Sequence, residues 1–514
     1  MNQSTQGKKI VILGGGTAGW MAANYLAVHW LQKGFEITLI ESPEIGIIGV
    51  GEGSTPPLKE FLAAIGVTES DWMVECNATY KVGITFRNWS TKPGFESYVH
   101  PFLCQPDDYT VPAFFHNSFL IRKGVDLEGH PDHFFLATHL LKNRLSPVAP
   151  ENFPFEIKYG YHFDSGLLGK FLGRWAVAKG VKHKQAKVTA VMIKENGYLG
   201  AVKTDADEVI EGDLFVDCTG FRSQLLQQTL GAKFNSFADR LFNDSAVVFP
   251  TEQEANVECQ TQATALKHGW AWKIPLTSRN GNGYVYSSSF CSADEAETEL
   301  RSHLGLLDAD IEARHLKMKV GRVDQHWYKN CLAVGLSQGF IEPLEATALD
   351  LVQTTLARFV EFVEKGNFTD QYRDDYNAAV NTRFDAVRDY IHCHYRINSR
   401  TDTEYWRANA SNENMSPSLR AILKTWVSGS NITDELERQK LDAYFPNVSW
   451  NCLLAGKGIY PEKHQLRAGN ELAHRFKLAD IRRFIERCGL NFKPHHEALA
   501  ALRVAEPAVM RKLA

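Results

Sequence analysis

Three glycines near the start of the chain, Gly14, Gly16 and Gly19, have the G-x-G-x-x-G spacing that suits the pyrophosphate of a dinucleotide. The first glycine permits a tight turn, the second lets the backbone approach the phosphates, and the third allows a helix to pack closely. Glu41 follows 22 residues after Gly19, where a carboxylate can accept hydrogen bonds from a ribose. The spacing predicts a dinucleotide site. The alternative is a glycine-rich turn that binds nothing.

The segments around these glycines have the order that such a site requires. Residues 8–13, KKIVIL, predict a β-strand, and the residues after Gly19 predict a helix that ends at Gly34. Residues 35–41, FEITLIE, predict a second strand. Thr17 and Ala18 stand at the start of the helix, where unpaired N–H groups and the helix dipole attract phosphate.

Two later segments favour FAD over NAD as the dinucleotide. Residues 213–225, DLFVDCTGFRSQL, and 331–351, CLAVGLSQGFIEPLEATALDL, resemble the segments near the nucleotide and the flavin in two-segment FAD folds. We therefore expect an α/β chain with a two-segment FAD-binding fold, Rossmann-like and of the aromatic-hydroxylase type. The later segment reads GLSQG where such hydroxylases typically read GDAAH, which disfavours a single-component hydroxylase.

The pattern of the chain predicts two parts. We expect residues 1–350 to form the FAD-binding domain, with a less regular, substrate-side insertion at about residues 87–160. Strand-like runs dominate from there to about residue 335. Apolar residues recur with a helical period in 350–365 and 372–391. We therefore expect residues 351–514 to be mainly helical and to complete the substrate site.

The composition excludes several classes of function. The 514 residues carry a formal net charge of −4, which gives no basic surface for nucleic acid or for an anionic membrane. No run of 18 apolar residues predicts a membrane span. Nine cysteines without a C-x-x-C pair predict reduced, buried thiols in a cytoplasmic protein. His392 and His394 flank Cys393, but this spacing in a helix points the two rings apart, so no metal site is predicted.

Four motifs, in the same order, resemble those of the flavin-dependent tryptophan halogenase family. GVGEGSTPPL at residues 49–58 is similar to the family's flavin-side loop, and YKVG at 80–83 to the segment with its reactive lysine. WAWKIP at 270–275 matches the family's W-x-W-x-I-P, and FIEPLE at 340–345 matches its F-V-E-P-L-E. The resemblance covers most of the chain and is strongest from about residue 8 to 350.

The resemblance implies a chemistry for Lys81 and Glu345. In the family, reduced FAD, oxygen and halide give hypohalous acid, which is delivered to an aromatic ring. Lys81 would hold this electrophile through a hydrogen bond or as a haloamine, whereas a lysine considered alone is usually a surface residue. Glu345 would stabilise the cationic ring intermediate and help to remove its proton. Its alternative role is that of an acid in the first turn of a helix.

The resemblance also implies where substrate and flavin lie. His100 and Phe102 would pack against the substrate ring, and Phe445 would supply the opposite face. Trp270 and Trp272 would separate flavin from substrate, a role compatible with ordinary core packing. The further positions implied at the flavin are Gly51, Val188, Leu336 and Leu349.

The halide site departs from the family pattern. Halide would bind at Thr347 and Ala348, but the family reads Ser-Thr-Gly where this chain reads Ala346-Thr347-Ala348. The serine hydroxyl that would bond Lys81 is absent, and a methyl group replaces the glycine. Chloride is smaller and more tightly hydrated than bromide, so an imperfect pocket disfavours it more. We therefore expect bromide to be favoured.

The segment expected to bind the substrate also differs from the family pattern. Residues 432–450 lack the tyrosine pair and glutamate that clamp the amino-acid part of tryptophan in the tryptophan enzymes, which disfavours free tryptophan as substrate.

The sequence thus predicts an FADH2-dependent halogenase for an aromatic or indole-type substrate. A separate flavin reductase would supply FADH2 as a transient partner, since no second nicotinamide-binding G-x-G-x-x-G is present. The pattern also allows a homodimer. Two alternatives remain: a flavin monooxygenase that hydroxylates an aromatic compound, and a non-catalytic FAD-binding protein, against which Lys81 and Glu345 argue.

Overall fold

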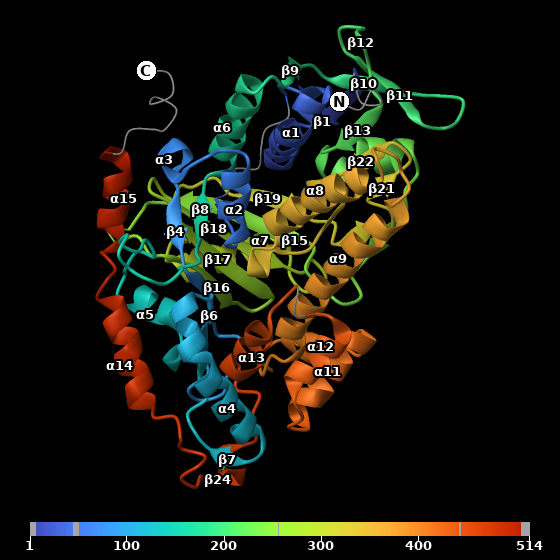
Figure 1. Ribbon diagram of the computed structural model, residues 1–514. Helices are drawn as coiled ribbons and strands as arrows, with labels where there is room; N and C mark the ends of the chain where they lie inside the picture. The colour runs from blue at the N-terminus through green and yellow to red at the C-terminus, as the bar shows by residue number, and fades with distance from the viewer. Residues whose placement is uncertain (1–6, 45–50, 255, 442–443, 505–514) are drawn as a thin grey trace.

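The computed structural model describes residues 7–44, 51–254, 256–441 and 444–504 (Figure 1). Strand β1 (Lys9–Leu13), helix α1 (Thr17–Trp30) and strand β2 (Glu36–Glu41) follow one another as predicted. A short 3₁₀ turn over Leu31–Lys33 leads into Gly34, whose φ of 90° ends the helical segment. The apolar residues of β1 are buried, which suits an inner strand of a sheet covered on both faces.

This first sheet has six strands in the order β21-β22-β13-β1-β2-β9. All of its pairs are parallel except β21 with β22. The parallel order arises because the helix α1 and longer segments cross between the strands. Its remaining strands are β9 (Lys182–Gln185), β13 (Leu214–Asp217), β21 (Trp327–Tyr328) and β22 (Cys331–Ala333). This is the predicted FAD-binding type of sheet.

A second, seven-stranded sheet carries several residues implied in the chemistry. Its order is β19-β15-β18-β17-β16-β5-β6, and only the pair β16 and β5 is parallel. The bounds are β5 (Gly83–Arg87), β6 (Ser97–Pro101), β15 (Ser245–Thr251), β16 (Gln260–Ala265), β17 (Gly269–Pro275), β18 (Asn280–Tyr286) and β19 (Arg314–Lys317). The tryptophan motif therefore lies on β17, near the middle of this sheet.

Four small sheets complete the strands. They pair β3 (Glu52–Gly53), β8 (Gly160–Phe163) and β4 (Thr79–Lys81); β10 (Val188–Ile193), β11 (Leu199–Thr204) and β12 (Val209–Glu211); β14 (Phe234–Ser236), β20 (Gly321–Val323) and β23 (Gly339–Phe340); and β7 (Val125–Asp126) with β24 (Arg467–Ala468).

The stretch at 87–160 is more regular than expected, because α4 (Val111–Arg122) and α5 (Leu136–Lys142) lie within it. The segment of α4 has little amphipathic period, since aromatic and aliphatic residues occur on several of its faces, so the pattern gave no helical signal. The other helices before residue 348 are α2 (Pro57–Ala64), α3 (Glu69–Trp72), α6 (Ser165–Ala178) and α7 (Ala293–Leu304).

The C-terminal third is mainly helical, as predicted. Its helices are α8 (Ala348–Lys365), α9 (Arg373–Arg396), α10 (Glu404–Ser411), α11 (Pro417–Val427), α12 (Ile432–Gln439), α13 (Asn447–Gly456), α14 (Leu478–Gly489) and α15 (His495–Val504). In Figure 1, α8 and α9 run beside the FAD-binding sheet, and α14 and α15 lie at the opposite edge of the molecule. None of the helices in the described ranges is long and apolar enough to cross a membrane.

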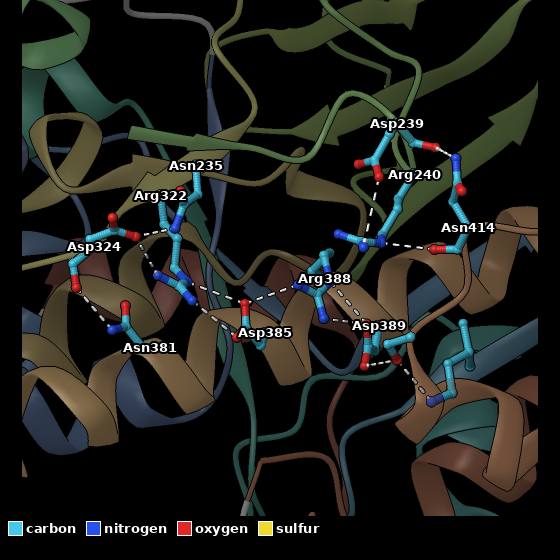
Figure 2. A network of polar contacts seen from close by, with 12 residues as sticks. Asn235, Asp239, Arg240, Arg322, Asp324, Asn381, Asp385, Arg388, Asp389 and Asn414 are labelled. Carbon is cyan, nitrogen blue, oxygen red and sulfur yellow. Dashed lines mark hydrogen bonds and ion pairs between the residues drawn. The ribbon is translucent and has the colours of Figure 1, made fainter. Parts of the chain in front are cut away.

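A chain of alternating charges fixes α9 to the strand β20. Arg322, on β20, donates from Nε and Nη2 to the two carboxylate oxygens of Asp385, at 3.2 and 3.1 Å. Arg388 bonds the same carboxylate at 3.0 Å and that of Asp389 at 2.8 Å. Figure 2 shows these four side chains in a row along the helix. The network fixes α9 against β20. Near its C-terminal end α9 carries His394, which lies beside Glu345.

Candidate active site

The glycine turn has the shape that a pyrophosphate needs. A Cβ on Gly14 would lie 2.2 Å from the carbonyl oxygen of Cys218, and one on Gly19 would lie 1.9 Å from that of Gly14. At Gly16, by contrast, a Cβ would meet no heavy atom within 4 Å. Gly16 caps α1 without a side-chain hydrogen bond. The turn is therefore closely packed on two sides and open where the phosphates would approach the helix.

The predicted nucleotide residues lie around this turn. The Glu41 carboxylate lies over Gly15, where an added Cβ would be 1.6 Å from its Oε2, and its Oε1 lies 2.7 Å from Nε2 of His183. The carbonyl oxygen of Glu41 accepts from the N–H of Ala186, two residues before Val188. Val188, the first residue of β10, therefore lies two residues beyond the backbone bond to the end of β2.

The flavin-side positions come from separate segments. A Cβ on Gly335 would lie 2.7 Å from the Cβ of Ala18, so the turn that carries Leu336 packs against the first turn of α1. Thr17, in the same turn of α1, donates through its hydroxyl to the carbonyl of Ser165. Leu349 is buried in the first turn of α8. Gly51 has φ +78° and lies against Ile274 and Gly281 of the second sheet and against Leu276, which follows β17.

Lys81 ends β4 and is fully buried. Its Nζ has no hydrogen-bond partner within the described ranges, and lies 5.4 Å from the ring centroid of Phe102. A Cβ on Gly53 would lie 3.1 Å from this Nζ, so the glycine gives the amine its space. Burial lowers the pKa of Lys81 to about 7, although the negative charge of Glu345 opposes the change. The side chain is therefore a buried amine with unused hydrogen-bonding capacity.

Glu345 ends the 3₁₀ turn Pro343–Glu345 and has both carboxylate oxygens occupied. Oε2 lies 2.8 Å from Nδ1 of His100, and Oε1 lies 2.8 Å from Nε2 of His394. Nε2 of His100 lies 2.9 Å from the hydroxyl of Ser449. Burial acts to raise the pKa of Glu345, but the electrostatic attraction of His100 and the hydrogen bonds from His100 and His394 hold it at about 2. The carboxylate is therefore ionised and held in one orientation.

The residues after Glu345 form the start of α8. Ala346 has φ +55°, a left-handed conformation that costs an alanine energy. Thr347 follows as the N-cap, and its buried hydroxyl has no hydrogen-bond partner in the described part of the chain. Ala348 begins the helix, so Thr347 and Ala348 lie at the positive end of its dipole.

Two of the three predicted substrate residues, His100 and Phe445, lie in one aromatic cluster, whereas Phe102 lies beside Lys81. Phe445 stacks on Tyr390, with ring centroids 3.7 Å apart and planes at 3°. Tyr390 in turn lies 6.1 Å from the ring of His100 and 4.8 Å from that of Trp450. The structure thus brings Phe445 into the cluster that includes His100, and in this state Phe445 packs on a tyrosine.

The predicted wall is a pair of buried tryptophans on β17. Trp270 and Trp272 have ring centroids 6.0 Å apart. Trp272 crosses Gly283 of the neighbouring strand, where an added Cβ would lie 2.1 Å from its ring. The indole N–H of Trp272 has no hydrogen-bond partner among the residues that the structure describes, whereas that of Trp270 interacts with the buried carboxylate of Glu342. The ring of Trp272 is thus held by packing.

Sequence reasoning missed two residues on α9. His394 bonds Glu345, and Tyr390 stacks on Phe445. The signal for His394 was the His392-Cys393-His394 run, which was considered only as a metal site. The same i, i+2 spacing also allows a helix in which His394 faces the site and His392 points away from it.

Known proteins share both the sequence pattern and this structure. The family model described as tryptophan halogenase matches residues 9–471. Tryptophan 6-halogenase SttH of Streptomyces toxytricini is 38% identical over 78% of this chain and 80% of its own. Tryptophan 7-halogenase RebH of Lentzea aerocolonigenes is 34% identical over 88% of this chain and 90% of its own. The structure of BrvH, a flavin-dependent halogenase from Brevundimonas sp. BAL3, has a TM-score of 0.83 at 30% identity, over 97% of this chain and 99% of that one.

Proposed function

The chain belongs to the tryptophan halogenase family and is a flavin-dependent halogenase, and from this premise we propose that it halogenates an aromatic, indole-type substrate by electrophilic substitution. The observation that carries the proposal is a buried amine, Lys81, close enough to Glu345 for their charges to interact. A site for hypohalous acid needs a donor, an anion for the cationic ring and the exclusion of water. Both side chains are buried, so the arrangement supports this chemistry.

The residues around the glycine turn fit FAD. The open space at Gly16 suits a pyrophosphate, and the uncapped start of α1 offers N–H donors to it. The flavin-side residues would be Gly51, Val188, Leu336 and Leu349. When bound, reduced FAD would supply, with oxygen, the oxidising chemistry that converts halide into hypohalous acid.

Lys81 would hold and orient the electrophile. Its pKa of about 7 leaves both the ammonium and the free amine populated at neutral pH. The ammonium donates a hydrogen bond to the oxygen of hypohalous acid, and the free amine carries the halogen as a haloamine with release of water. The Phe102 ring beside Nζ excludes solvent from that side.

Glu345 would stabilise the positive charge that develops on the ring. A carboxylate with a pKa of about 2 is a weak base, so its fixed charge is its main contribution. His100 bonds the same carboxylate and touches the aromatic cluster, which supports its role beside the substrate. Trp270 and Trp272 would separate this region from the flavin.

Thr347 and Ala348 would hold the halide at the start of α8, where the helix dipole favours an anion. The methyl group of Ala348 supports our proposal that bromide is favoured over chloride. A flavin reductase would be a transient partner, and a homodimer is part of the proposal. The nine free cysteines, eight of them buried, support a cytoplasmic location.

The experiment that tests the function combines the purified protein with a flavin reductase, NADH, FAD, oxygen and bromide. Indoles, tryptophan and phenols are offered as substrates, and products are read by mass spectrometry. We expect a product with the bromine isotope doublet that requires both bromide and the halogenase. A hydroxylated product without halogen, formed at the same rate without bromide, would contradict the proposal. A turnover of tryptophan above that of indole would contradict the interpretation of residues 432–450.

A further inference from the structure

A second buried lysine lies behind Glu345. Lys457 follows α13 and is 1% exposed. Its Nζ donates to the carbonyl oxygen of His394 at 2.6 Å and lies 4.4 Å from the ring centroid of Trp89. No carboxylate in the described ranges lies within 4.0 Å of it. A buried ammonium without an ion pair costs free energy, so its position calls for a compensating role.

His394 connects this lysine to the site. The carboxylate of Glu345 can only accept hydrogen bonds, so the proton of the neutral His394 ring is on Nε2, which lies 2.8 Å from Oε1. The other ring nitrogen, Nδ1, has no hydrogen-bond partner in the described part of the chain. It is therefore the position where a second proton would add. A histidine beside a carboxylate ordinarily gains that proton, and the carboxylate charge is then cancelled.

We propose that Lys457 is a positioning residue for halogenation: its ammonium keeps His394 neutral, so that His394 remains an N–H donor and Glu345 keeps a full negative charge. This inference rests on the proposed function, in which the charge of Glu345 stabilises the cationic ring. Two adjacent buried cations would repel each other strongly, so the positive charge on Lys457 excludes one on His394. The negative charge of Glu345 is thus balanced by the more distant ammonium of Lys457, and it is not neutralised by a protonated His394 in direct contact with it.

The electrostatics of the surroundings agree with this arrangement. Burial lowers the pKa of His394 to about 3, and the charge of Lys457 is the next cause. Burial lowers the pKa of Lys457 to about 7, with Cys393 and Glu345 opposing the change. The ionisable groups around the pair are Cys393 and Tyr390 on α9, Glu345, and His100 on β6.

Two substitutions separate the charge of Lys457 from its hydrogen bond. Lys457→Met removes both, whereas Lys457→Gln removes the charge and keeps a donor for the carbonyl of His394. The matched control is Lys92→Met, because Lys92 also donates to a backbone carbonyl, that of Gly458, at 2.8 Å, and is partly exposed. Folding of each variant is checked by thermal melting.

The first measurement is the titration of the His394 ring by NMR in enzyme labelled with ¹⁵N-histidine. The signal is assigned by its loss in His394→Asn. We expect the pKa of His394 to rise by about one unit or more in both Lys457 variants and to stay unchanged in Lys92→Met. This measurement does not require turnover, so it separates failure of this inference from failure of the proposed function.

The second measurement is the pH profile of kcat. A raised pKa of His394 cancels the Glu345 charge at low pH, so we expect the acidic limb of the kcat profile to move to higher pH in both variants, by about the shift that the titration of His394 measures. An unchanged His394 titration in a folded Lys457 variant would overturn the inference. So would a Lys457→Gln enzyme that behaves like wild type while Lys457→Met does not, because the hydrogen bond and not the charge would then be responsible.

Discussion

His394 Nε2 lies 2.8 Å from Oε1 of Glu345, and this contact joins helix α9 to the FIEPLE motif at residues 340–345. With His100 on the other oxygen, the carboxylate is fixed at both ends. Because both oxygens already accept hydrogen bonds, Glu345 is a weak base for removing the proton from the substrate ring, unless a neighbouring group takes that proton. We expect charge stabilisation to be the larger contribution of Glu345.

We expect Glu345→Gln to lower kcat by about 10²–10⁴-fold, because the amide keeps the shape of the side chain and loses its charge. The matched control is Asp350→Asn, since Asp350 is the acid in the first turn of α8. If Glu345 served only as an acid near the helix terminus, both substitutions would have similar small effects. A loss below about threefold in Glu345→Gln, with chemistry rate-limiting, would remove the catalytic role.

The residues that were predictable from sequence are those in contiguous motifs. The turn at Gly14 and Gly19 has a local cause, since a side chain at either glycine would collide with the backbone. Lys81 and Glu345 were identified from separate motifs, and the structure places both in buried positions whose charges interact. Their roles stay predictions.

The support around Glu345 could not be predicted in the same way. His394 and Lys457 reach the site through the packing of α9 and the end of α13, and no local pattern records that packing. The helix α4 was missed for a related reason, because it is apolar on several faces and has no amphipathic period. In both cases the position of the element depends on tertiary contacts that the local sequence does not show.

Substitution of Gly16 tests the nucleotide site. We expect Gly16→Val to weaken FAD binding with little effect on the melting temperature of the apoprotein, because a Cβ there meets no protein atom within 4 Å. Gly19→Val is the contrasting variant and should destabilise the fold, since its Cβ would lie 1.9 Å from the carbonyl of Gly14. Flavin fluorescence measures the affinity. Unchanged affinity in Gly16→Val would show that the pyrophosphate binds elsewhere.

The halide preference is tested by competition at equal bromide and chloride. We expect mainly brominated product from the wild type, and a larger chlorinated share from Ala348→Gly. The glycine removes the methyl group at the start of α8 and so frees the backbone amides that face an anion. Product masses give the ratio directly. Mainly chlorinated product from the wild type would mean that Ala348 leaves the site unchanged.

The stability of the protein should depend on Glu342, a buried acid of the FIEPLE motif that accepts a hydrogen bond from Asn243 and whose pKa burial raises to about 7 from an ordinary 4.5. Between these values the unfolded chain releases a proton that the folded chain keeps, so this group lowers stability as pH rises from about 4.5 to 7. We expect Glu342→Gln to raise the melting temperature, relative to wild type, more at pH 8 than at pH 5. An equal difference at both pH values would show that Glu342 is ionised throughout.

Lys81→Met tests the central claim, that a buried lysine holds the electrophile. Methionine keeps most of the volume of the buried side chain and removes the amine. In the assay with reductase, NADH, FAD, oxygen and bromide, we predict that halogenated product falls by about 10²-fold or more while oxygen consumption by the reduced flavin stays near the wild-type rate. Halogenated product at close to the wild-type rate from folded, FAD-binding Lys81→Met enzyme would contradict the account.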